Sequence, residues 1–324
     1  MSGGRPRIVV TRRIPDPALE LLGERADVWL SPHDRPLAPD ELYAAAAGAD
    51  GLVTLLHDRV DDALLDAAGP QLRVVANVAV GYDNADLEAC RRHGVVLTNT
   101  PGVLTEATAD IAFALILMVT RRLGEGERLV RAGGTWTWSM FFLLGTGIQG
   151  KTLGIVGLGQ IGTAVARRAR AFGMRIAYTG RRRSAPEMEA ELGAEWIDEV
   201  DELVAAADVV SLHCPLTPQT HHLIDARRLS LMKPRAYLVN TTRGPVVDEA
   251  ALVSALRDGT IAGAGLDVFE NEPAVHPGLV ELDQAVLIPH LGSATIETRT
   301  AMAVLAARNA LAVVHGEAPL TPVT

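Results

Sequence analysis

Three glycines near the middle of the chain have the spacing of a dinucleotide-binding turn. Gly157, Gly159 and Gly162 follow an apolar run typical of a buried strand and open a helical pattern that leads to a second strand. In this setting the first glycine allows a tight turn, the second lets the backbone approach a pyrophosphate, and the third lets the helix pack closely. The helix N-terminus at Gln160 and Ile161 then offers free N–H groups to the phosphates. A dinucleotide site is therefore predicted here.

The residues after the second strand indicate which dinucleotide would bind. A site for NAD usually has Asp or Glu about 20 residues beyond the glycines, where it bonds the ribose 2′-hydroxyl. Here the strand ends at Gly180, and Arg181, Arg182 and Arg183 follow without an acid. Guanidinium groups are good donors to a 2′-phosphate, and no carboxylate is present to repel one. NADP(H) is predicted, with NAD(H) as the weaker alternative; a solvated basic loop is the other interpretation.

Three ionisable residues, Arg243, Glu272 and His290, each come after an expected strand. Hydride transfer to a 2-keto acid needs one of each kind. A guanidinium holds the carboxylate, an imidazolium gives a proton to the carbonyl oxygen, and a carboxylate orients the imidazole and raises its pKa. Each residue also has an ordinary explanation, as a helix cap, a solvated loop acid or a satisfied core histidine. Their recurrence at strand ends, next to a dinucleotide turn, favours a joint catalytic role.

Short strands and helices alternate along the whole chain, which predicts an α/β fold with mainly parallel sheets. Before the glycine turn, strands are expected near residues 7–11, 27–30, 51–55, 73–77 and 95–98. After it, strands are expected near residues 208–214, 236–241, 263–269 and 285–288. Long helices are expected at residues 106–124 and 296–314.

This order predicts two doubly wound parallel-sheet domains, of the Rossmann-like or flavodoxin-like kind, with the active site in the cleft between them. Residues 1–100 and 295–324 are expected to form one discontinuous domain. Residues 101–294 form the NAD(P)-binding domain, in which residues 133–150 are irregular and rich in aromatic side chains.

Composition excludes several other classes of protein. With 324 residues, 48% of them hydrophobic, two full cores are expected. The net charge of −9 argues against a nucleic-acid partner. Cys90 and Cys214 have neither disulfide-framework nor metal-ligand spacing, so no metal site and a reducing cytoplasm are expected. The longest apolar run, residues 111–119, is too short to span a bilayer.

Several motifs resemble those of the D-isomer-specific 2-hydroxyacid dehydrogenases, and most closely those of the glyoxylate/hydroxypyruvate reductase branch. They extend over most of the chain and read NVAVGYDNADL, TPGVLTEATADIA, VGLGQIG, SLHCPLTPQTHHLI, VNTTRGPVVDEAAL, GLDVFENEP and IPHLGSAT. By motif, Arg243, Glu272 and His290 match the catalytic residues of this family. The resemblance implies that Arg243 anchors the substrate, Glu272 orients His290, and His290 is the general acid and base.

The resemblance also implies the binding residues and the assembly. Val80 and Gly81 would offer backbone N–H groups to the substrate carboxylate, and residues 1–100 with 295–324 would form the substrate-binding domain. A homodimer is implied, joined through the cofactor domain with residues 120–150 as the dimerisation segment. The remaining positions that match cofactor contacts are Thr108, Cys214, Thr220, Thr241, Asp267 and Gly292.

One departure from the reductase branch concerns the substrate pocket. The branch often has a tryptophan that reaches into the neighbouring subunit's site, and Phe142 stands at that position here. Trp138 is retained and is the expected pocket wall. A bulkier 2-keto acid than glyoxylate therefore stays open as a substrate. So does a dinucleotide-sensing protein resembling the family's corepressors. Among the enzymes of the family, the 3-phosphoglycerate and phosphite dehydrogenases are nearer alternatives than the corepressors, although both usually favour NAD.

Overall fold

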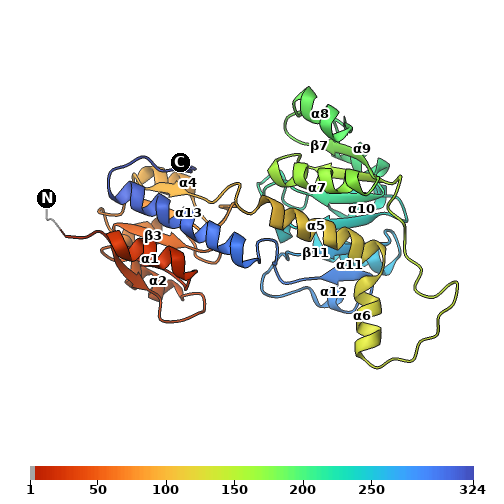
Figure 1. Cartoon of the computed structure of the whole chain (residues 1–324), viewed down its shortest axis with the longest axis horizontal. Helices are drawn as coiled ribbons and strands as arrows, with labels where there is room; N and C mark the ends of the chain where they lie inside the picture. The colour runs from red at the N-terminus through yellow and green to blue at the C-terminus, as the bar shows by residue number, and fades with distance from the viewer. Residues whose placement is uncertain (1–3) are drawn as a thin grey trace. The chain divides into compact units, whose positions relative to one another are not determined.

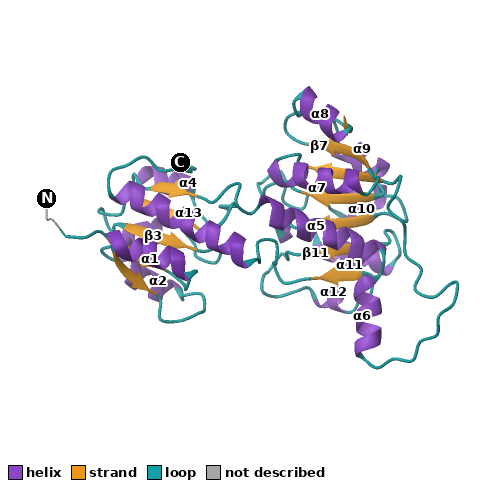
Figure 2. Ribbon diagram, in the orientation of Figure 1, coloured by secondary structure: helices purple, strands orange, loops and turns teal. Residues whose placement is uncertain are grey.

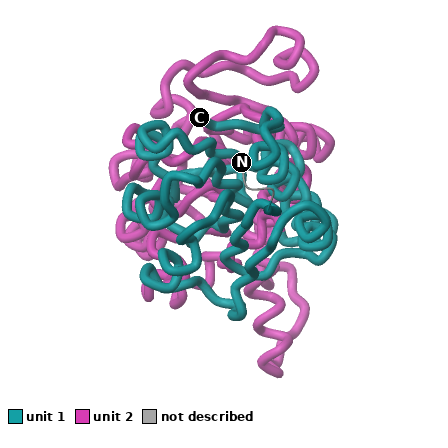
Figure 3. The backbone as a smooth tube through the Cα atoms, turned by 90° about the vertical axis from the view of Figure 1, so that its left-hand side faces the viewer, with its two compact units in different colours: residues 1–104, 294–324 teal, residues 105–293 magenta. Residues whose placement is uncertain are grey.

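The computed structural model describes residues 4–324, which belong to two compact α/β units (Figure 3). Unit 1 comprises residues 1–104 and 294–324, and unit 2 comprises residues 105–293. Each unit contains one parallel sheet with helices on both faces (Figure 2). The predicted fold class, two doubly wound parallel-sheet domains, is therefore confirmed.

Unit 1 contains a five-stranded sheet in the order β2-β1-β3-β4-β5, which is the flavodoxin-like order. Its elements are β1 (Arg7–Val10), α1 (Asp16–Arg25), β2 (Asp27–Leu30), α2 (Pro39–Ala46), β3 (Gly51–Thr54), α3 (Asp62–Ala68), β4 (Val74–Asn77), α4 (Leu87–Arg92), β5 (Val96–Thr98) and α13 (Ile296–Val314). Helices α2, α3 and α4 cover one face, and α1 and α13 cover the other. Strands β1, β3 and β4 are apolar because both faces of the sheet are buried.

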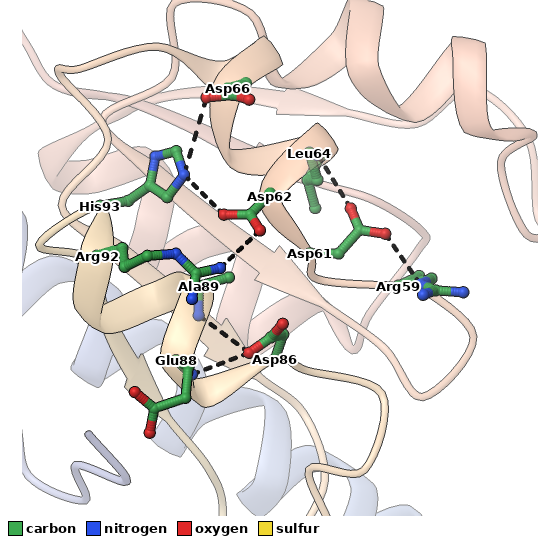
Figure 4. A network of polar contacts seen from close by, with 10 residues as sticks. All are labelled: Arg59, Asp61, Asp62, Leu64, Asp66, Asp86, Glu88, Ala89, Arg92 and His93. Atoms are coloured by element: carbon green, nitrogen blue, oxygen red, sulfur yellow. Dashed lines mark hydrogen bonds and ion pairs between the residues drawn. The ribbon is translucent and has the colours of Figure 1, made fainter.

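A polar network joins the start of α3 to α4 (Figure 4). Asp61 caps α3 by accepting a hydrogen bond from the Leu64 N–H, and Asp86 caps α4. Asp62 then links the two helices, because its carboxylate contacts the Arg92 guanidinium at 2.6 Å and His93 Nε2 at 3.2 Å. The Asp62 and Arg92 side chains are 51% and 55% exposed, so the caps contribute more to stability than this ion pair does.

Unit 2 contains a seven-stranded sheet in the order β12-β11-β10-β9-β6-β7-β8. Its elements are α5 (Thr105–Thr120), α6 (Leu123–Arg131), β6 (Thr152–Val156), α7 (Gln160–Ala171), β7 (Arg175–Thr179), α8 (Pro186–Leu192), β8 (Ala194–Trp196), α9 (Val200–Ala206), β9 (Val209–Leu212), α10 (Ala226–Leu231), β10 (Tyr237–Asn240), the 3₁₀ turn η1 (Gly244–Val246), α11 (Glu249–Arg257), β11 (Gly263–Leu266), α12 (Pro277–Val280) and β12 (Ala285–Leu287). The strand order reverses between β6 and β9, and ligands bind at such a switch point in open α/β sheets.

The prediction of one long helix over residues 106–124 is wrong at the C-terminal end of that range. Helix α5 ends at Thr120, whose hydroxyl donates a hydrogen bond to the Ile116 carbonyl oxygen. The backbone then turns through Arg122, which has a left-handed φ of +55° and pairs with Glu125. A new helix, α6, begins at Leu123. Helix α5 is apolar along its length because it packs against α7 and the sheet. The hydrophobic pattern of the sequence therefore does not indicate the turn at Arg122.

Helix α6 and the loop that follows it extend away from the rest of unit 2 (Figure 1). Residues 120–150 are called the arm below. The arm exposes large apolar side chains that are not covered within the described chain. They are Leu123, Val130, Trp136, Trp138, Met140, Phe141 and Leu144.

Candidate active site

The glycine turn lies between β6 and α7, next to the switch point of the unit 2 sheet. Gly157 has a φ of +98°, and a Cβ there would lie 2.9 Å from the carbonyl carbon of His213. A Cβ on Gly162 would lie 2.3 Å from the Gly157 oxygen, whereas one on Gly159 would meet nothing within 4 Å. Two of the glycines are thus required by the turn, and Gly159 leaves open space for a ligand. This geometry fits the predicted pyrophosphate position.

Helix α7 begins at Gln160, and the N–H groups of Gln160 and Ile161 at its N-terminus carry a partial positive charge because of the helix dipole. The first turn contains no acidic residue that would neutralise this charge. Two polar atoms at the carboxyl ends of neighbouring strands are buried without a hydrogen-bond partner among residues 4–324. They are Nδ1 of His213, after β9, and Oγ1 of Thr241, after β10. Unpaired buried polar atoms are costly, so they indicate a place where a polar ligand completes the hydrogen bonding.

The three arginines after β7 are not equivalent. Arg183 makes two hydrogen bonds to the Glu189 carboxylate, from Nε at 2.8 Å and from Nη2 at 2.9 Å. The neighbouring Ser184 N–H donates to the hydroxyl of buried Tyr178 at 2.9 Å. Arg181 and Arg182 are exposed and make no side-chain hydrogen bond or ion pair with the described residues. Two guanidinium groups are therefore available next to Gly180, which lies close to Gly157.

His290 and Glu272 form a hydrogen-bonded pair. His290 follows β12 with a left-handed φ of +51°, and its N–H donates to the Asp267 carbonyl oxygen at 2.8 Å. Its Nδ1 lies 2.9 Å from Glu272 Oε2, and the two side chains are 32% and 27% exposed. Nε2 makes no hydrogen bond within residues 4–324. The imidazole is thus oriented by the carboxylate and presents its other nitrogen to a ligand.

Arg243 lies beside this pair, after β10, and its positive charge helps to lower the pKa of Glu272. Burial alone would raise the pKa of that carboxyl. The hydrogen bonds from His290 and the Phe269 N–H, together with the charges of His290 and Arg243, outweigh burial, so the pKa of Glu272 is below its ordinary value. The Arg243 carbonyl oxygen accepts a hydrogen bond from Asn240 Nδ2 at 2.9 Å, which fixes the backbone of the turn. The structure therefore brings Arg243, Glu272 and His290 together.

Asp267, Gly292 and Thr108 also lie together. Asp267 follows β11 and is 1% exposed, and burial raises its pKa. Its Oδ2 accepts a hydrogen bond from the Gly292 N–H at 2.8 Å. A Cβ on Gly292 would lie 3.4 Å from the methyl carbon of Thr108. These three residues form one group at the carboxyl end of β11.

Cys214 and Thr220, in the segment after β9, are engaged in the structure itself. Cys214 is buried, and burial raises the pKa of its thiol to about 11, so it is not a reactive thiolate. The hydroxyl of Thr220 donates to the Pro215 oxygen at 2.6 Å and accepts from the Thr217 N–H at 2.8 Å. Thr220 therefore shapes this loop as well as being a candidate cofactor contact.

In unit 1, the loop after β4 directs its carbonyl groups into the protein. The Val80 oxygen accepts a hydrogen bond from Asn99 Nδ2 at 2.8 Å, and the Gly81 oxygen accepts one from Asn77 Nδ2 at 3.2 Å. The N–H groups of Val80 and Gly81 have no acceptor in the part of the chain that the structure describes. Two adjacent free N–H groups of this kind can bind an anion such as a carboxylate.

Comparison with known proteins agrees with this geometry. The family model for the NAD-binding domain of D-isomer-specific 2-hydroxyacid dehydrogenases matches residues 113–292. A glyoxylate reductase of Thermococcus onnurineus is 49% identical over 98% of this chain and 95% of its own length. The chain belongs to the D-isomer-specific 2-hydroxyacid dehydrogenase family. It is an NAD(P)-dependent dehydrogenase, and its relatives place it in the glyoxylate reductase branch.

Solved structures of similar proteins have the same fold. A protein from Thermus thermophilus has a TM-score of 0.91 and 46% identity, covering 98% of this chain and 100% of that one. The NADPH-dependent glyoxylate/hydroxypyruvate reductase of Sinorhizobium meliloti, solved with NADP and malonate, has a TM-score of 0.85 and 38% identity, covering 99% and 97%. A nicotinamide dinucleotide is therefore the cofactor of this family member.

Two aromatic residues that the sequence analysis singled out lie in the arm. Trp138 is 72% exposed and makes no ring contact or hydrogen bond with the described residues. Phe142 stacks on Trp136 with ring centroids 6.0 Å apart. Trp138 is thus not held against the Arg243, Glu272 and His290 group of its own unit.

Neither a membrane-spanning helix nor a cluster of metal ligands is found among the described residues. None of the helices within residues 4–324 is long and apolar enough to cross a membrane. In the same part of the chain, no cluster of three or more His, Cys, Asp or Glu side chains is arranged to hold a metal ion.

Proposed function

We propose that this dehydrogenase uses NADPH to reduce glyoxylate and hydroxypyruvate to glycolate and D-glycerate. The observation that carries the proposal is the hydrogen bond between Glu272 and His290 Nδ1, with Arg243 beside the pair. It provides an oriented acid and a carboxylate clamp at the strand ends of a dinucleotide-binding unit. The names of the relatives, which are glyoxylate reductases, support this choice of substrates.

In the proposed mechanism each of the three side chains has one task. The bound nicotinamide supplies a hydride to the carbonyl carbon of the substrate. Arg243 holds the substrate carboxylate through paired N–H donors. His290 donates the proton on Nε2 to the carbonyl oxygen, because this nitrogen has no partner in the described chain. Glu272 accepts from Nδ1 and stabilises the imidazolium before the proton is donated.

The preference for NADPH is inferred from the loop after β7. Arg181 and Arg182 are unpaired in the described structure, whereas Arg183 is held by Glu189. The 2′-phosphate of NADPH matches two free guanidinium groups, and no carboxylate stands at the end of β7 to favour a 2′-hydroxyl. The relative from Sinorhizobium meliloti, an NADPH-dependent enzyme solved with NADP, supports the same choice. NAD(H) remains the weaker alternative cofactor.

Unit 2 is the proposed cofactor domain and unit 1 the proposed substrate domain. The free N–H groups of Val80 and Gly81 would bind the substrate carboxylate in addition to Arg243. The buried atom Thr241 Oγ1 would complete its hydrogen bonding on the cofactor. Asp267 would hold the nicotinamide carboxamide, and Thr108, Cys214, Thr220 and Gly292 would line the same site. We place the enzyme in the cytoplasm, where its two free cysteines would stay reduced.

The experiment that tests this function measures NADPH and NADH oxidation with glyoxylate, hydroxypyruvate, pyruvate and longer 2-keto acids at neutral pH. The highest kcat/KM is expected for NADPH with glyoxylate or hydroxypyruvate. Activity with longer keto acids alone would favour the second candidate, a dehydrogenase for a bulkier substrate. The observation that supports this candidate is Phe142, which stands where the reductase branch often has tryptophan. Tight NADPH binding without any turnover would instead favour a dinucleotide sensor.

The arm is the proposed homodimer interface. Its exposed side chains include Trp138, Met140 and Phe141, the last of which is 85% exposed. Large apolar side chains that are exposed along one segment are typical of an association site. Trp138 would then reach the pocket of the neighbouring subunit, since it is 72% exposed and makes no ring contact or hydrogen bond with the described residues.

We expect the double substitution Met140→Asp and Phe141→Asp to convert the dimer into a monomer. Burying two carboxylates in the apolar centre of an interface without positively charged partners carries a large desolvation penalty. Mass measured by light scattering during gel filtration checks this result. Val280→Asp is the matched control, because Val280 is 67% exposed in unit 2 but lies outside the arm. A dimer that survives the arm substitutions would refute this interface.

A further inference from the structure

One buried carboxylate has no task in the mechanism above. Glu249 is the first residue of α11 and is 4% exposed. It makes no ion pair with a lysine or arginine within residues 4–324, and burial raises its pKa. It is not needed to cap α11, because the Asp248 carboxylate already accepts the Ala251 N–H at 2.9 Å. A buried acid of this kind is costly unless backbone donors satisfy it.

The donor that satisfies Glu249 belongs to the loop that carries Glu272. Its Oε1 accepts a hydrogen bond from the Glu270 N–H at 2.7 Å. The His276 side chain also favours the ionised form of the Glu249 carboxylate. Glu270 and His276 are the two ends of the loop of residues 270–276, and Glu272 lies between them. Glu249 therefore holds this loop at Glu270, two residues before Glu272.

The same loop is held at further points, one of which is the contact between the Glu270 carboxylate and His222 Nε2. A Cβ on Gly244 would lie 1.8 Å from the carbonyl carbon of Phe269, so the backbone of η1 packs directly against the start of the loop. Inside the loop, the Phe269 N–H donates to Glu272 Oε1 at 3.0 Å, which leaves Oε2 for His290. The loop has no regular secondary structure between β11 and α12. Its shape therefore depends on these side-chain and packing contacts.

We propose that Glu249 is a positioning residue, which holds the 270–276 loop so that Glu272 Oε2 stays against His290 Nδ1. The importance of this pair for proton transfer rests on the proposed function, whereas the geometric claim does not. Arg243 and Asp267 are charged groups that act electrostatically on the pair, whereas the loop residues Glu270 and His276 act on Glu249. A change at Glu249 should therefore act on the pair through the loop.

Glu249→Ala removes the acceptor for the Glu270 N–H, and kcat with glyoxylate should fall about ten-fold. The KM for NADPH should change by less than about two-fold, since loss of a positioning contact acts mainly on the chemical step. With Glu272 less well held, kcat/KM should begin to decline at a lower pH on the alkaline side. Glu249→Gln keeps one oxygen acceptor and should lose only about two- to three-fold.

The matched control is Asp225→Ala, which removes the cap of α10. The Asp225 carboxylate accepts the Arg228 N–H at 2.8 Å, and α10 packs against α11. This variant should lower the melting temperature but leave kcat and the pH profile unchanged. If Glu249→Ala does not fold, Glu249→Gln is compared with the same control.

A second readout does not depend on the substrate. The His290 imidazole resonance, assigned by its loss in His290→Asn, is titrated by NMR in each variant. Its midpoint should move to lower pH in Glu249→Ala and stay in place in Asp225→Ala. An inactive wild-type protein with a midpoint that still moves would overturn the proposed function and keep the role of Glu249. A folded Glu249→Ala protein with the wild-type midpoint and pH profile would overturn the role itself.

Discussion

His290→Asn is expected to reduce kcat for glyoxylate reduction by about 1,000-fold or more, the usual range for loss of a general acid being 10²–10⁴. Asparagine retains a hydrogen bond to Glu272 but has no proton of suitable acidity for the carbonyl oxygen. NADPH affinity should stay within about two-fold, because the glycine turn and the arginine loop are built from other residues. Single-turnover kinetics and fluorescence titration with NADPH measure the two effects separately.

The pH dependence gives this prediction a direction. Reduction requires the protonated imidazole, so the rate of the wild-type enzyme should fall as pH rises. Glu272 has a lowered pKa, so it stays ionised at neutral pH and supports the protonated ring. Glu272→Gln removes that charge and should move the decline to lower pH, with a smaller loss at acidic pH. Retained turnover in His290→Asn would exclude His290 as the proton donor.

The parts of the site that the sequence predicts are those with a local cause. Gly157 needs a left-handed φ and close approach of the backbone, and Gly162 leaves room for the Gly157 oxygen, so glycine is required at both places. His290 and Glu272 follow strands whose apolar runs are easy to find. Parallel strands end at the same edge of a sheet, so residues after them converge although they are distant in sequence.

The contacts that hold these residues in place could not be predicted, because they depend on tertiary structure. Glu249 has the pattern of an ordinary acid in the first turn of a helix, and only the fold shows that its carboxylate reaches the Glu272 loop. Asn99 supports the Val80 carbonyl from a different strand end. Strand β8 has three residues, too few for an alternating pattern to be visible. Arg122 breaks the predicted long helix without glycine or proline as a signal.

The second large effect concerns the choice of cofactor. Arg181→Ala combined with Arg182→Ala is expected to weaken NADPH binding about 100-fold and NADH binding less than about three-fold. Each charge-assisted hydrogen bond to a phosphate contributes about 1.5–3 kcal/mol, and the two guanidinium groups meet only the 2′-phosphate. Rising salt should weaken NADPH binding in the wild type more than in the double variant, because exposed charges are screened. Fluorescence titration with both cofactors measures these changes.

The control for this pair must remove the same net charge from the same unit. Arg170→Ala with Arg175→Ala does so, since both side chains are exposed. Arg175 stands at the first residue of β7, whereas Thr179 and the arginine loop are at its other end. A general effect of charge on a tetra-anionic cofactor would weaken NADPH in both double variants. A loss confined to Arg181 and Arg182, and to NADPH, would mean that these two residues read the 2′-phosphate; equal loss of NADH would mean that they only support the loop.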